Sequence, residues 1–248
     1  MTDTIDALTG VRYHAADGIG RITLARPEAS NAIDLPTAVS LGQAVSQAVI
    51  DPAVRVILID GDGPRFCAGG DVAAMAAADD KPAAVRGLAE SLDAVLVTLD
   101  ATDKPVIAAV RGAVAGAGLG ILLACDLVVA ARTTKLLTAY TSVGITPDCG
   151  VSWLLPRAVG QQRALEMVLT GRPLSAEEAQ AWGLVTMAVE DAELEAESDA
   201  LATRIAALPP FATGQARRLV RSSWTVSRQA ATVDEVDTVT EAARRAFA

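Results

Sequence analysis

Short apolar runs rich in β-branched residues alternate with helical patterns in this sequence, and this alternation most constrains the fold. The runs at residues 54–60, 105–110 and 126–131 are the right length for buried strands. Between them, apolar residues recur every three or four positions after Pro36 and again over residues 85–99. Strands that alternate with helices at this spacing predict crossover units and a largely parallel sheet, that is, an α/β fold.

The chain changes character after Pro156, where helical patterns dominate. The helical stretches are residues 161–169, 176–181, 194–208, 211–224 and 230–247, and a strand-like segment interrupts them at 184–189. A sheet-rich part followed by a helical tail predicts a core with a helical cap or association module. We place the boundary between residues 192 and 193.

Composition excludes several classes of protein. Of 248 residues, 51% are hydrophobic and 21% charged, which excludes a disordered chain, and a net charge of −9 argues against nucleic-acid binding. The single histidine, His14, makes a metal site unexpected, and an odd number of cysteines fits a reducing compartment. The acidic N-terminus is unlike a signal peptide, and Arg111 and Asp126 interrupt the most apolar stretch. We therefore expect a cytoplasmic protein without a membrane span.

Two glycine-rich segments each follow a predicted strand. They are FCAGGD at residues 66–71 and GAVAGAGLG at residues 112–120. Small residues let the backbone approach a ligand and leave N–H groups free to point at it. Each segment alone also fits an ordinary strand-to-helix turn or close helix packing, with Asp71 near a helix N-terminus. Together they could aim two N–H donors at one oxygen, the arrangement that stabilises an oxyanion.

Asp148 is the acid that stands out, because its neighbours in the segment 144–155 are mostly apolar. A carboxyl in such surroundings is suited to proton transfer. The same residue, after a proline and before a helical run, also fits a helix N-cap. Asp126 lies in a buried strand pattern and is predicted to be structural, and His14 is predicted to be a strand residue.

Several motifs together resemble the enoyl-CoA hydratase/isomerase (crotonase) superfamily. They cover essentially the whole chain, and the ordered set is highly specific for the superfamily. The motifs are RPEASNA at 26–32, FCAGGD at 66–71, GAVAGAG at 112–118 with CDL at 125–127, the turn ending in PD at 147–148 with LPRAVG at 155–160, and GRPLSAEEA at 171–179 followed by WGLV at 182–185.

The resemblance implies a core of repeated ββα units wound into a spiral over residues 1–192. Residues 193–248 then form a helical region used in trimerisation or capping, and the protein is a homotrimer or hexamer. The substrate implied is an acyl-CoA thioester, in which coenzyme A is part of the substrate. No separate cofactor and no metal are implied.

The resemblance also assigns roles to individual residues. The backbone N–H groups of Ala68 and Ala117 would be the two oxyanion-hole donors, although relatives commonly carry glycine at the second position. Asp148 would be the catalytic acid and base. The residues implied to contact substrate are Ala29, Ala68, Gly69, Gly70, Asp71, Ala117 and Tyr140.

The subgroup is decided by where acids are present. Hydratases of the superfamily use two glutamates, whose positions fall on Gly120 and Tyr140 here, and neither residue can activate water as a glutamate does. A group of Δ3-Δ2 enoyl-CoA isomerases instead places one acid in the turn that matches residues 147–150, where some aryl-CoA dehalogenases carry a nucleophilic aspartate. Asp148 occupies that position, so the resemblance predicts a single-acid enoyl-CoA isomerase.

Three alternatives remain open from the sequence. One is a hydratase in which Asp148 and an unidentified group handle water. Another is an acyl-CoA-binding protein that has lost catalysis, since both glutamate positions are changed. Nucleophilic displacement by Asp148 is the third, and it is disfavoured because aromatic residues make up only 3% of the chain.

Overall fold

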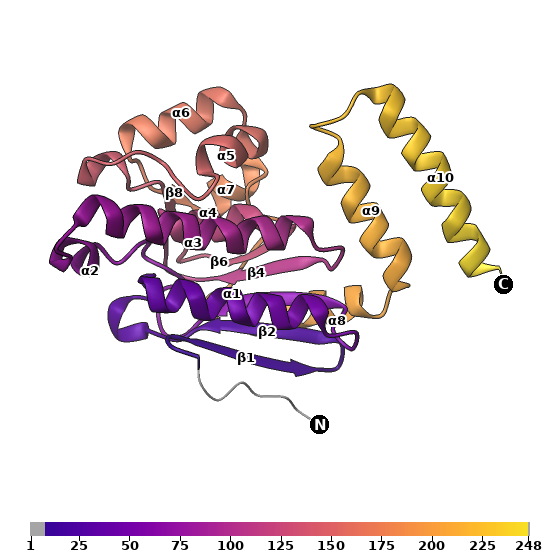
Figure 1. Ribbon diagram of the computed structural model, residues 1–248, viewed down its shortest axis with the longest axis horizontal. Helices are drawn as coiled ribbons and strands as arrows, with labels where there is room; N and C mark the ends of the chain where they lie inside the picture. The colour runs from indigo at the N-terminus through magenta and orange to yellow at the C-terminus, as the bar shows by residue number, and fades with distance from the viewer. Residues whose placement is uncertain (1–7, 248) are drawn as a thin grey trace.

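The protein has an α/β architecture, seen in a computed structural model that describes residues 8–247 (Figure 1). Its main sheet has the strand order β1-β2-β3-β4-β6-β9, and a second sheet has the order β5-β7-β8. β1 pairs with β2 antiparallel, and the remaining neighbours in the main sheet pair parallel. The predicted parallel sheet is therefore confirmed. The expectation about a signal peptide falls largely on residues 1–7, which lie outside the described residues.

The strands and helices have the following bounds. The strands are β1 Val11–Ala16, β2 Ile19–Leu24, β3 Val56–Gly61, β4 Val106–Val110, β5 Ala113–Ala115, β6 Leu127–Ala131, β7 Lys135–Leu137, β8 Leu174–Ser175 and β9 Met187–Val189. The α-helices are α1 Leu35–Ile50, α2 Val72–Ala77, α3 Lys81–Ala101, α4 Ala117–Ala124, α5 Val151–Val159, α6 Gln161–Thr170, α7 Ala176–Trp182, α8 Leu194–Ala206, α9 Pro210–Ser222 and α10 Arg228–Ala246. Short 3-10 turns lie at Pro27–Ala29, Thr141–Val143 and Asp191–Glu193.

Both faces of the main sheet are buried, and its central strands show this by strict alternation. In β3, Ile57 and Ile59 pack into the larger core with α1, α3 and α4, whereas Val56 and Leu58 pack on the opposite face against α8. β4 and β6 alternate in the same way. A sheet covered on both faces needs strands that are apolar throughout, which is why these runs were recognisable in the sequence.

Helix starts follow from local sequence. The Asp34 side chain caps α1 by accepting a hydrogen bond from the Thr37 N–H at 2.9 Å, and a proline occupies the first turn. Asp80 caps α3 in the same manner. Helix α5 is the helical run that the sequence places after Asp148, and it continues through Pro156. Among residues 8–247, no helix has both the length and the apolarity needed to cross a bilayer.

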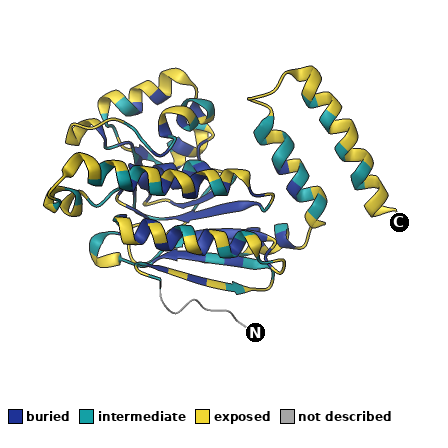
Figure 2. Cartoon of the chain, viewed as in Figure 1, coloured by how far each residue is buried: buried dark blue, intermediate teal, exposed yellow. Residues whose placement is uncertain are grey.

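The helical C-terminal region has two different parts. α8 packs on the sheet, where Leu194, Leu201 and Ala202 are buried against it. α9 and α10 form a hairpin beside the body, and α10 has no buried residue (Figures 1 and 2). The hairpin contacts the body through α9. The compact body therefore includes α8, and the protruding part begins after it.

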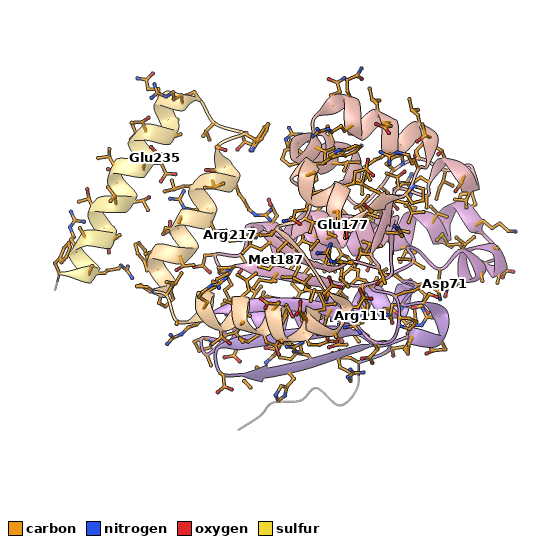
Figure 3. All side chains as sticks on the ribbon, turned by 180° about the vertical axis from the view of Figure 1, so that it is seen from behind. Asp71, Arg111, Glu177, Met187, Arg217 and Glu235 are labelled. Atoms are coloured by element: carbon orange, nitrogen blue, oxygen red, sulfur yellow. The ribbon has the colours of Figure 1, made fainter. Side chains whose placement is uncertain are left out.

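A partly buried carboxylate fastens α9 to the body. Asp126 Oδ2 accepts hydrogen bonds from the Val106 N–H and from Arg217 Nε, each at 2.7 Å, and Oδ1 accepts from Arg221 Nε at 2.7 Å. Arg217, whose side chain is only 6% exposed, faces the body and also donates to the carbonyl of Leu99 at 2.6 Å (Figure 3). This arrangement supports the prediction that Asp126 is structural.

Asp126→Asn should destabilise the protein strongly. The substitution removes the charge that compensates buried Arg217, and breaking such a pair costs about 3 to 5 kcal/mol. The measurement is the free energy of unfolding from urea titration. Asp100→Asn is the matched control: Asp100 also pairs with Arg221, but its side chain is 59% exposed, and exposed pairs contribute under about 1 kcal/mol. Equal losses in the two variants would contradict this account.

Candidate active site

The two glycine-rich segments lie side by side, joined by backbone pairing. The Cys67 N–H donates to the Ala113 carbonyl at 3.2 Å, and the Ala115 N–H donates to the Cys67 carbonyl at 3.0 Å. Gly69 then passes so close to the second segment that an added Cβ would lie 3.2 Å from the Ala115 oxygen and 3.8 Å from the Ala117 nitrogen. The sequence prediction that these segments converge is supported by these contacts.

Helix α4 begins at Ala117 and presents free N–H groups at this junction. The Gly120 N–H donates to the Gly116 carbonyl at 3.1 Å, so the first residues of the helix, Ala117 to Leu119, have no acceptor within it. The peptide plane that joins Gly116 to Ala117 directs its carbonyl into the helix. Its N–H therefore points away from the helix, toward the Gly69 side.

The amide of Ala68 does not have the freedom expected of it. Its N–H donates to the Ser30 carbonyl at 3.1 Å, in the loop that follows β2. An oxyanion-hole donor must be free to bind the substrate oxygen, so this contact contradicts the role predicted for the Ala68 amide. The prediction is wrong only about the orientation of the Ala68 peptide, because the segment 66–71 does lie beside the second glycine-rich segment.

Gly70 has the orientation that Ala68 lacks. The Ile33 N–H donates to the Gly69 carbonyl at 2.8 Å, and the Asp71 N–H donates to the Ile33 carbonyl at 2.8 Å. In a trans peptide the C=O and the following N–H point in opposite directions. The Gly70 N–H therefore points away from Ile33, toward the side on which Ala115 to Ala117 pass. Among the described residues, neither the Gly70 N–H nor the Ala117 N–H has a backbone acceptor, so these two amides are free at the junction.

The remaining residues of the first loop are fixed by protein contacts. Asp71 caps α2, accepting from the Ala74 N–H at 3.0 Å, and it pairs with Arg26 at 3.1 Å. Arg26 also pairs with Asp34 at 3.1 Å. Asp71 is thus occupied in structure, as the simpler of its two sequence interpretations held. Ala29 ends a 3-10 turn beside Ser30, next to the Ala68 segment.

Asp148 lies in the turn before α5 but does not cap that helix. The cap residue is Gly150, which makes no side-chain cap hydrogen bond, and Asp148 contributes only its carbonyl to the Val151 N–H at 2.9 Å. Its Oδ1 atom is buried and has no hydrogen-bond partner among residues 8–247. A buried carboxylate oxygen left without a partner is costly. The N-cap interpretation is therefore excluded, and the carboxyl is left for another role.

Tyr140 connects this carboxyl to the amide junction. It is 4% exposed, and an added Cβ on Gly116 would lie 3.9 Å from its ring carbon Cζ. Burial raises the pKa of the Tyr140 hydroxyl well above its ordinary value, and the negative charge of Asp148 raises it further. Tyr140 is consequently protonated at neutral pH. The structure thus brings Tyr140 together with Gly116 on one side and Asp148 on the other.

Thiols around the site are neutral. Burial raises the pKa of Cys67 to about 12. Burial also raises the pKa of Cys149, with the charge of Asp148 as the second cause. Neither thiol is a nucleophile at neutral pH, because the thiolate is the reactive form.

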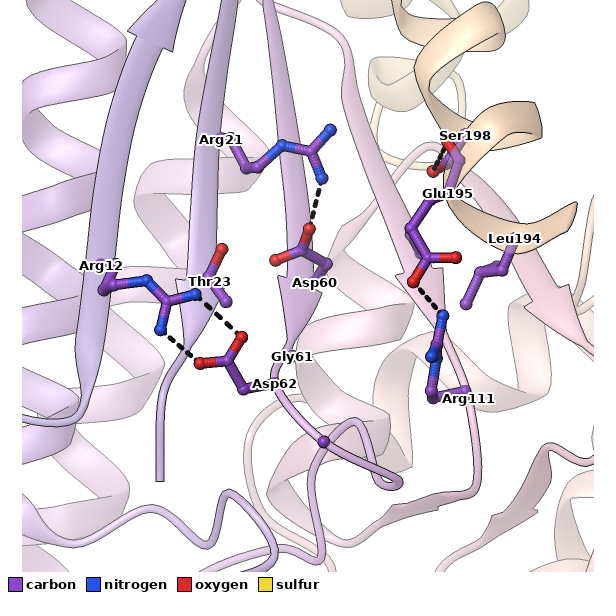
Figure 4. A pocket seen from close by; sticks show the side chains of 12 residues that line it. Arg12, Arg21, Thr23, Asp60, Gly61, Asp62, Arg111, Leu194, Glu195 and Ser198 are labelled. Carbon is purple, nitrogen blue, oxygen red and sulfur yellow. Dashed lines mark hydrogen bonds and ion pairs between the residues drawn. The ribbon is translucent and has the colours of Figure 1, made fainter. Parts of the chain in front are cut away.

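A separate cavity of about 300 Å³ lies beneath α8 at the ends of β3 and β4 (Figure 4). Its charges are paired within the protein: Arg12 donates to Asp62 at 2.8 Å, Arg21 donates to Asp60 at 2.5 Å, and Arg111 pairs with Glu195. None of the sequence-predicted site residues lines it. The converging amides and the unpaired carboxyl, not this cavity, form the candidate active site.

Known proteins resemble this chain over most of its length. The family model described as enoyl-CoA hydratase/isomerase matches residues 14–244. The chain is 36% identical over 214 residues to the 1,2-epoxyphenylacetyl-CoA isomerase of Escherichia coli, covering 86% of this chain and 82% of that one. It is also 36% identical over 198 residues to the trans-2-decenoyl-[acyl-carrier-protein] isomerase of Streptococcus mutans, covering 79% and 75%.

Solved structures agree with this assignment. The crystal structure of an enoyl-CoA hydratase from Bacillus anthracis superimposes with a TM-score of 0.89 at 29% identity, covering 94% of this chain and 90% of that one. The likeness spans both the sheet-rich part and the helical C-terminal region. The spiral core implied by the sequence motifs is the fold of these relatives. This chain belongs to the enoyl-CoA hydratase/isomerase family.

Proposed function

We propose that the protein moves a double bond from the Δ3 to the Δ2 position of an enoyl-CoA thioester. The observation that carries the proposal is the Asp148 carboxyl, whose buried Oδ1 has no hydrogen-bond partner among residues 8–247. It lies beside Tyr140, the residue that adjoins the amide junction. Isomerisation needs one acid-base group, because the proton that is removed is replaced by an equivalent one. The activity of the Streptococcus mutans relative, an isomerase by name, is of this class.

In the proposed reaction, the thioester oxygen accepts hydrogen bonds from the Gly70 and Ala117 N–H groups. Asp148 removes a proton from C2, and the electron pair delocalises onto the thioester oxygen as a dienolate. The protonated Asp148 then delivers a proton to C4, so that the double bond moves from C3–C4 to C2–C3. Atoms and charge balance without a further cofactor, and each amide donor is worth about 3 to 4 kcal/mol of the barrier.

Hydration is disfavoured by the packing around Gly120, one of the two positions that hold glutamates in hydratases. An added Cβ on Gly120 would lie 2.7 Å from the Cys149 Cβ and 3.0 Å from the Cys149 carbonyl oxygen. The second position holds Tyr140, which is neutral. A water molecule would therefore have no pair of carboxylates to orient and activate it.

We also propose that the protein assembles as a trimer or a hexamer through its C-terminal hairpin. α10 buries none of its residues in the single chain, and Val233, Val236 and Val239 are all exposed. At about 100° per residue, these three valines lie within an arc of about 120° on the helix. A helix stabilised by so little tertiary packing is expected to gain its stability from a partner surface.

Asp148→Asn should abolish isomerisation while leaving acyl-CoA binding largely intact. The amide cannot accept the C2 proton, and general acid-base groups contribute about 10²- to 10⁴-fold to rate. The measurement is the absorbance of the conjugated thioester formed from a 3-enoyl-CoA, with affinity measured by calorimetry. Asp93→Asn, an exposed acid on α3, is the control that keeps activity. Retained isomerase activity in Asp148→Asn would contradict the proposal.

The same assay separates the alternatives. Loss of conjugated absorbance when wild-type protein is incubated with a 2-enoyl-CoA would indicate a hydratase. Binding of 2-enoyl and 3-enoyl thioesters without turnover would indicate a catalytically degenerate acyl-CoA-binding protein. Either result, in wild-type protein that lacks isomerase activity, would overturn the proposed function.

Gly120→Ala should destabilise the protein, whereas Gly87→Ala should not. Both glycines are helical, but a Cβ at Gly87 meets nothing within 4 Å, and one at Gly120 meets the Cys149 backbone. Replacing glycine by alanine within a helix is otherwise stabilising by about 0.5 to 1 kcal/mol. Thermal unfolding measures both variants. A Gly120→Ala protein as stable as Gly87→Ala would show that the space beside Cys149 can open.

Val236→Asp should shift the assembly toward monomers, because a charge on the exposed valine face opposes burial of that face. Light scattering coupled to size-exclusion chromatography gives the mass. Wild-type protein should have three or six times the mass of one chain. Glu235→Asp, at the neighbouring position on α10, should leave the mass unchanged. A monomeric wild-type protein would contradict the proposed assembly.

A further inference from the structure

Two buried polar atoms without partners face the same part of the candidate site. One is the Tyr140 hydroxyl and the other is Asp148 Oδ1. A phenol that is protonated can donate one hydrogen bond, and an ionised carboxylate can only accept. The two groups are therefore a complementary donor and acceptor. Leaving both unsatisfied would cost each its desolvation penalty.

The two groups are also neighbours in space. The Tyr140 ring packs against Gly116, and Cys149, the residue after Asp148, packs against Gly120: a Cβ added to these glycines would lie 3.9 Å from Tyr140 Cζ and 2.7 Å from Cys149 Cβ, respectively. Gly116 and Gly120 are one helical turn apart at α4, so the two groups lie against the same face of that helix. In agreement with this, burial and then the charge of Asp148 raise the pKa of the Tyr140 hydroxyl. Tight turns fix the backbone of each residue. The Tyr140 carbonyl accepts from the N–H groups of Val143 and Ile145, at 3.1 and 3.2 Å, and the Asp148 carbonyl accepts from Val151.

Backbone strain lies next to both groups. Ala139, which precedes Tyr140, has a φ of 59°, and Cys149, which follows Asp148, has a φ of 50°. Residues other than glycine adopt such left-handed conformations at a cost, and that cost is concentrated at functional sites. The neighbouring residues on either side thus adopt unfavourable conformations that set the positions of Tyr140 and Asp148.

We propose that Tyr140 is the positioning residue for Asp148: its hydroxyl donates a hydrogen bond to the carboxylate and holds it, ionised, toward the Gly70 and Ala117 amides. This inference rests on the proposed isomerase function. It assigns the position of a hydratase glutamate to a neutral donor, which acts through Asp148 and not on water. A hydrogen bond to the ionised form of a carboxyl favours that form.

Other titratable groups lie near Asp148 on the elements around it. Cys149 in the same turn is a weak thiol donor that also contacts Asp148, and Cys67 in the first loop is a neutral buried thiol. Asp93 on α3 acts on Cys149 from an exposed position. On α5, Arg157 stacks on the Trp153 ring, 3.5 Å from its centroid. Helix α4 carries no titratable side chain.

Tyr140→Phe tests the role, because it removes the hydroxyl and little else. The acidic limb of the profile of kcat/KM against pH should move to higher pH, since the ionised base loses a donor. On the plateau of that profile we expect kcat/KM to fall roughly three- to tenfold, with kcat affected more than KM. The substrate is a 3-enoyl-CoA, and the readout is conjugated thioester absorbance.

Tyr13→Phe is the matched control, a second buried tyrosine, located in β1. It should leave the pH profile of the wild-type protein unchanged. A Tyr140→Phe profile with an unmoved acidic limb would overturn the inference, and a change in KM alone would assign the hydroxyl to substrate binding instead. If wild-type protein lacks isomerase activity, the proposed function itself fails, so the two failures are distinguishable.

A second measurement does not depend on the folding of Tyr140→Phe. The chain has two tyrosines, so in the Tyr13→Phe background biosynthetic incorporation of 3-fluorotyrosine modifies Tyr140 alone. Fluorine makes the phenol more acidic and a stronger donor, and the acidic limb should then move to lower pH. Movement in the opposite direction, or none, would overturn the inference.

Discussion

The backbone pairing between Cys67 and β5 is the interaction on which the site depends. It holds two loops, each leaving the end of a buried strand, close enough for their N–H groups to converge. Such an approach requires residues without side-chain bulk. An added Cβ on Gly118 would lie 2.7 Å from both the Cys67 Cβ and the Cys67 carbonyl oxygen. The small residues of the two motifs are therefore a requirement of this pairing, and the free amides are its consequence.

The proposed chemistry combines a charge-stabilising half with a proton-transfer half. The first half would be made of main-chain N–H groups, which need no side chain. The second half would be the short turn that holds Asp148 near Tyr140, where burial keeps the neighbouring thiols neutral. In this proposal, one carboxyl and one neutral donor favour returning a proton to carbon. Two carboxylates, as in hydratases, would favour water.

In the C-terminal region, ionic contacts attach α9 to the body, whereas α10 remains exposed. Asp126 concentrates three hydrogen bonds on one partly buried carboxylate and thereby joins β4, β6 and α9. α10 is held to α9 by Arg218, which donates to both oxygens of Asp234 at 2.5 and 2.7 Å, but it buries none of its own residues (Figure 2). The hairpin is thus attached firmly at its first helix and left with an unburied second helix, which is the geometry expected of an association element.

Much of the fold was predictable from the sequence. Strands buried on both faces are continuous apolar runs, so β3, β4 and β6 could be located, and helical periodicity located α1, α3 and the C-terminal helices. The helical run after Asp148 is α5, but its end could not be predicted from the sequence, because Pro156 lies inside the helix. The short strands of the second sheet escaped detection because two or three residues carry no measurable periodicity.

For the candidate site, the sequence by itself pointed to three segments: the FCAGGD and GAVAGAG motifs and the turn at Asp148. Residue types and spacing suffice for that, because a close approach needs small residues and proton transfer needs an acid. Only the tertiary structure decided which amides are free. The carbonyls of Ser30 and Gly69 set the direction of each peptide in the first loop, and these contacts join residues distant in the chain. The direction of a peptide group depends on its hydrogen-bond partners. Because these partners are distant in the chain, the sequence alone does not identify them.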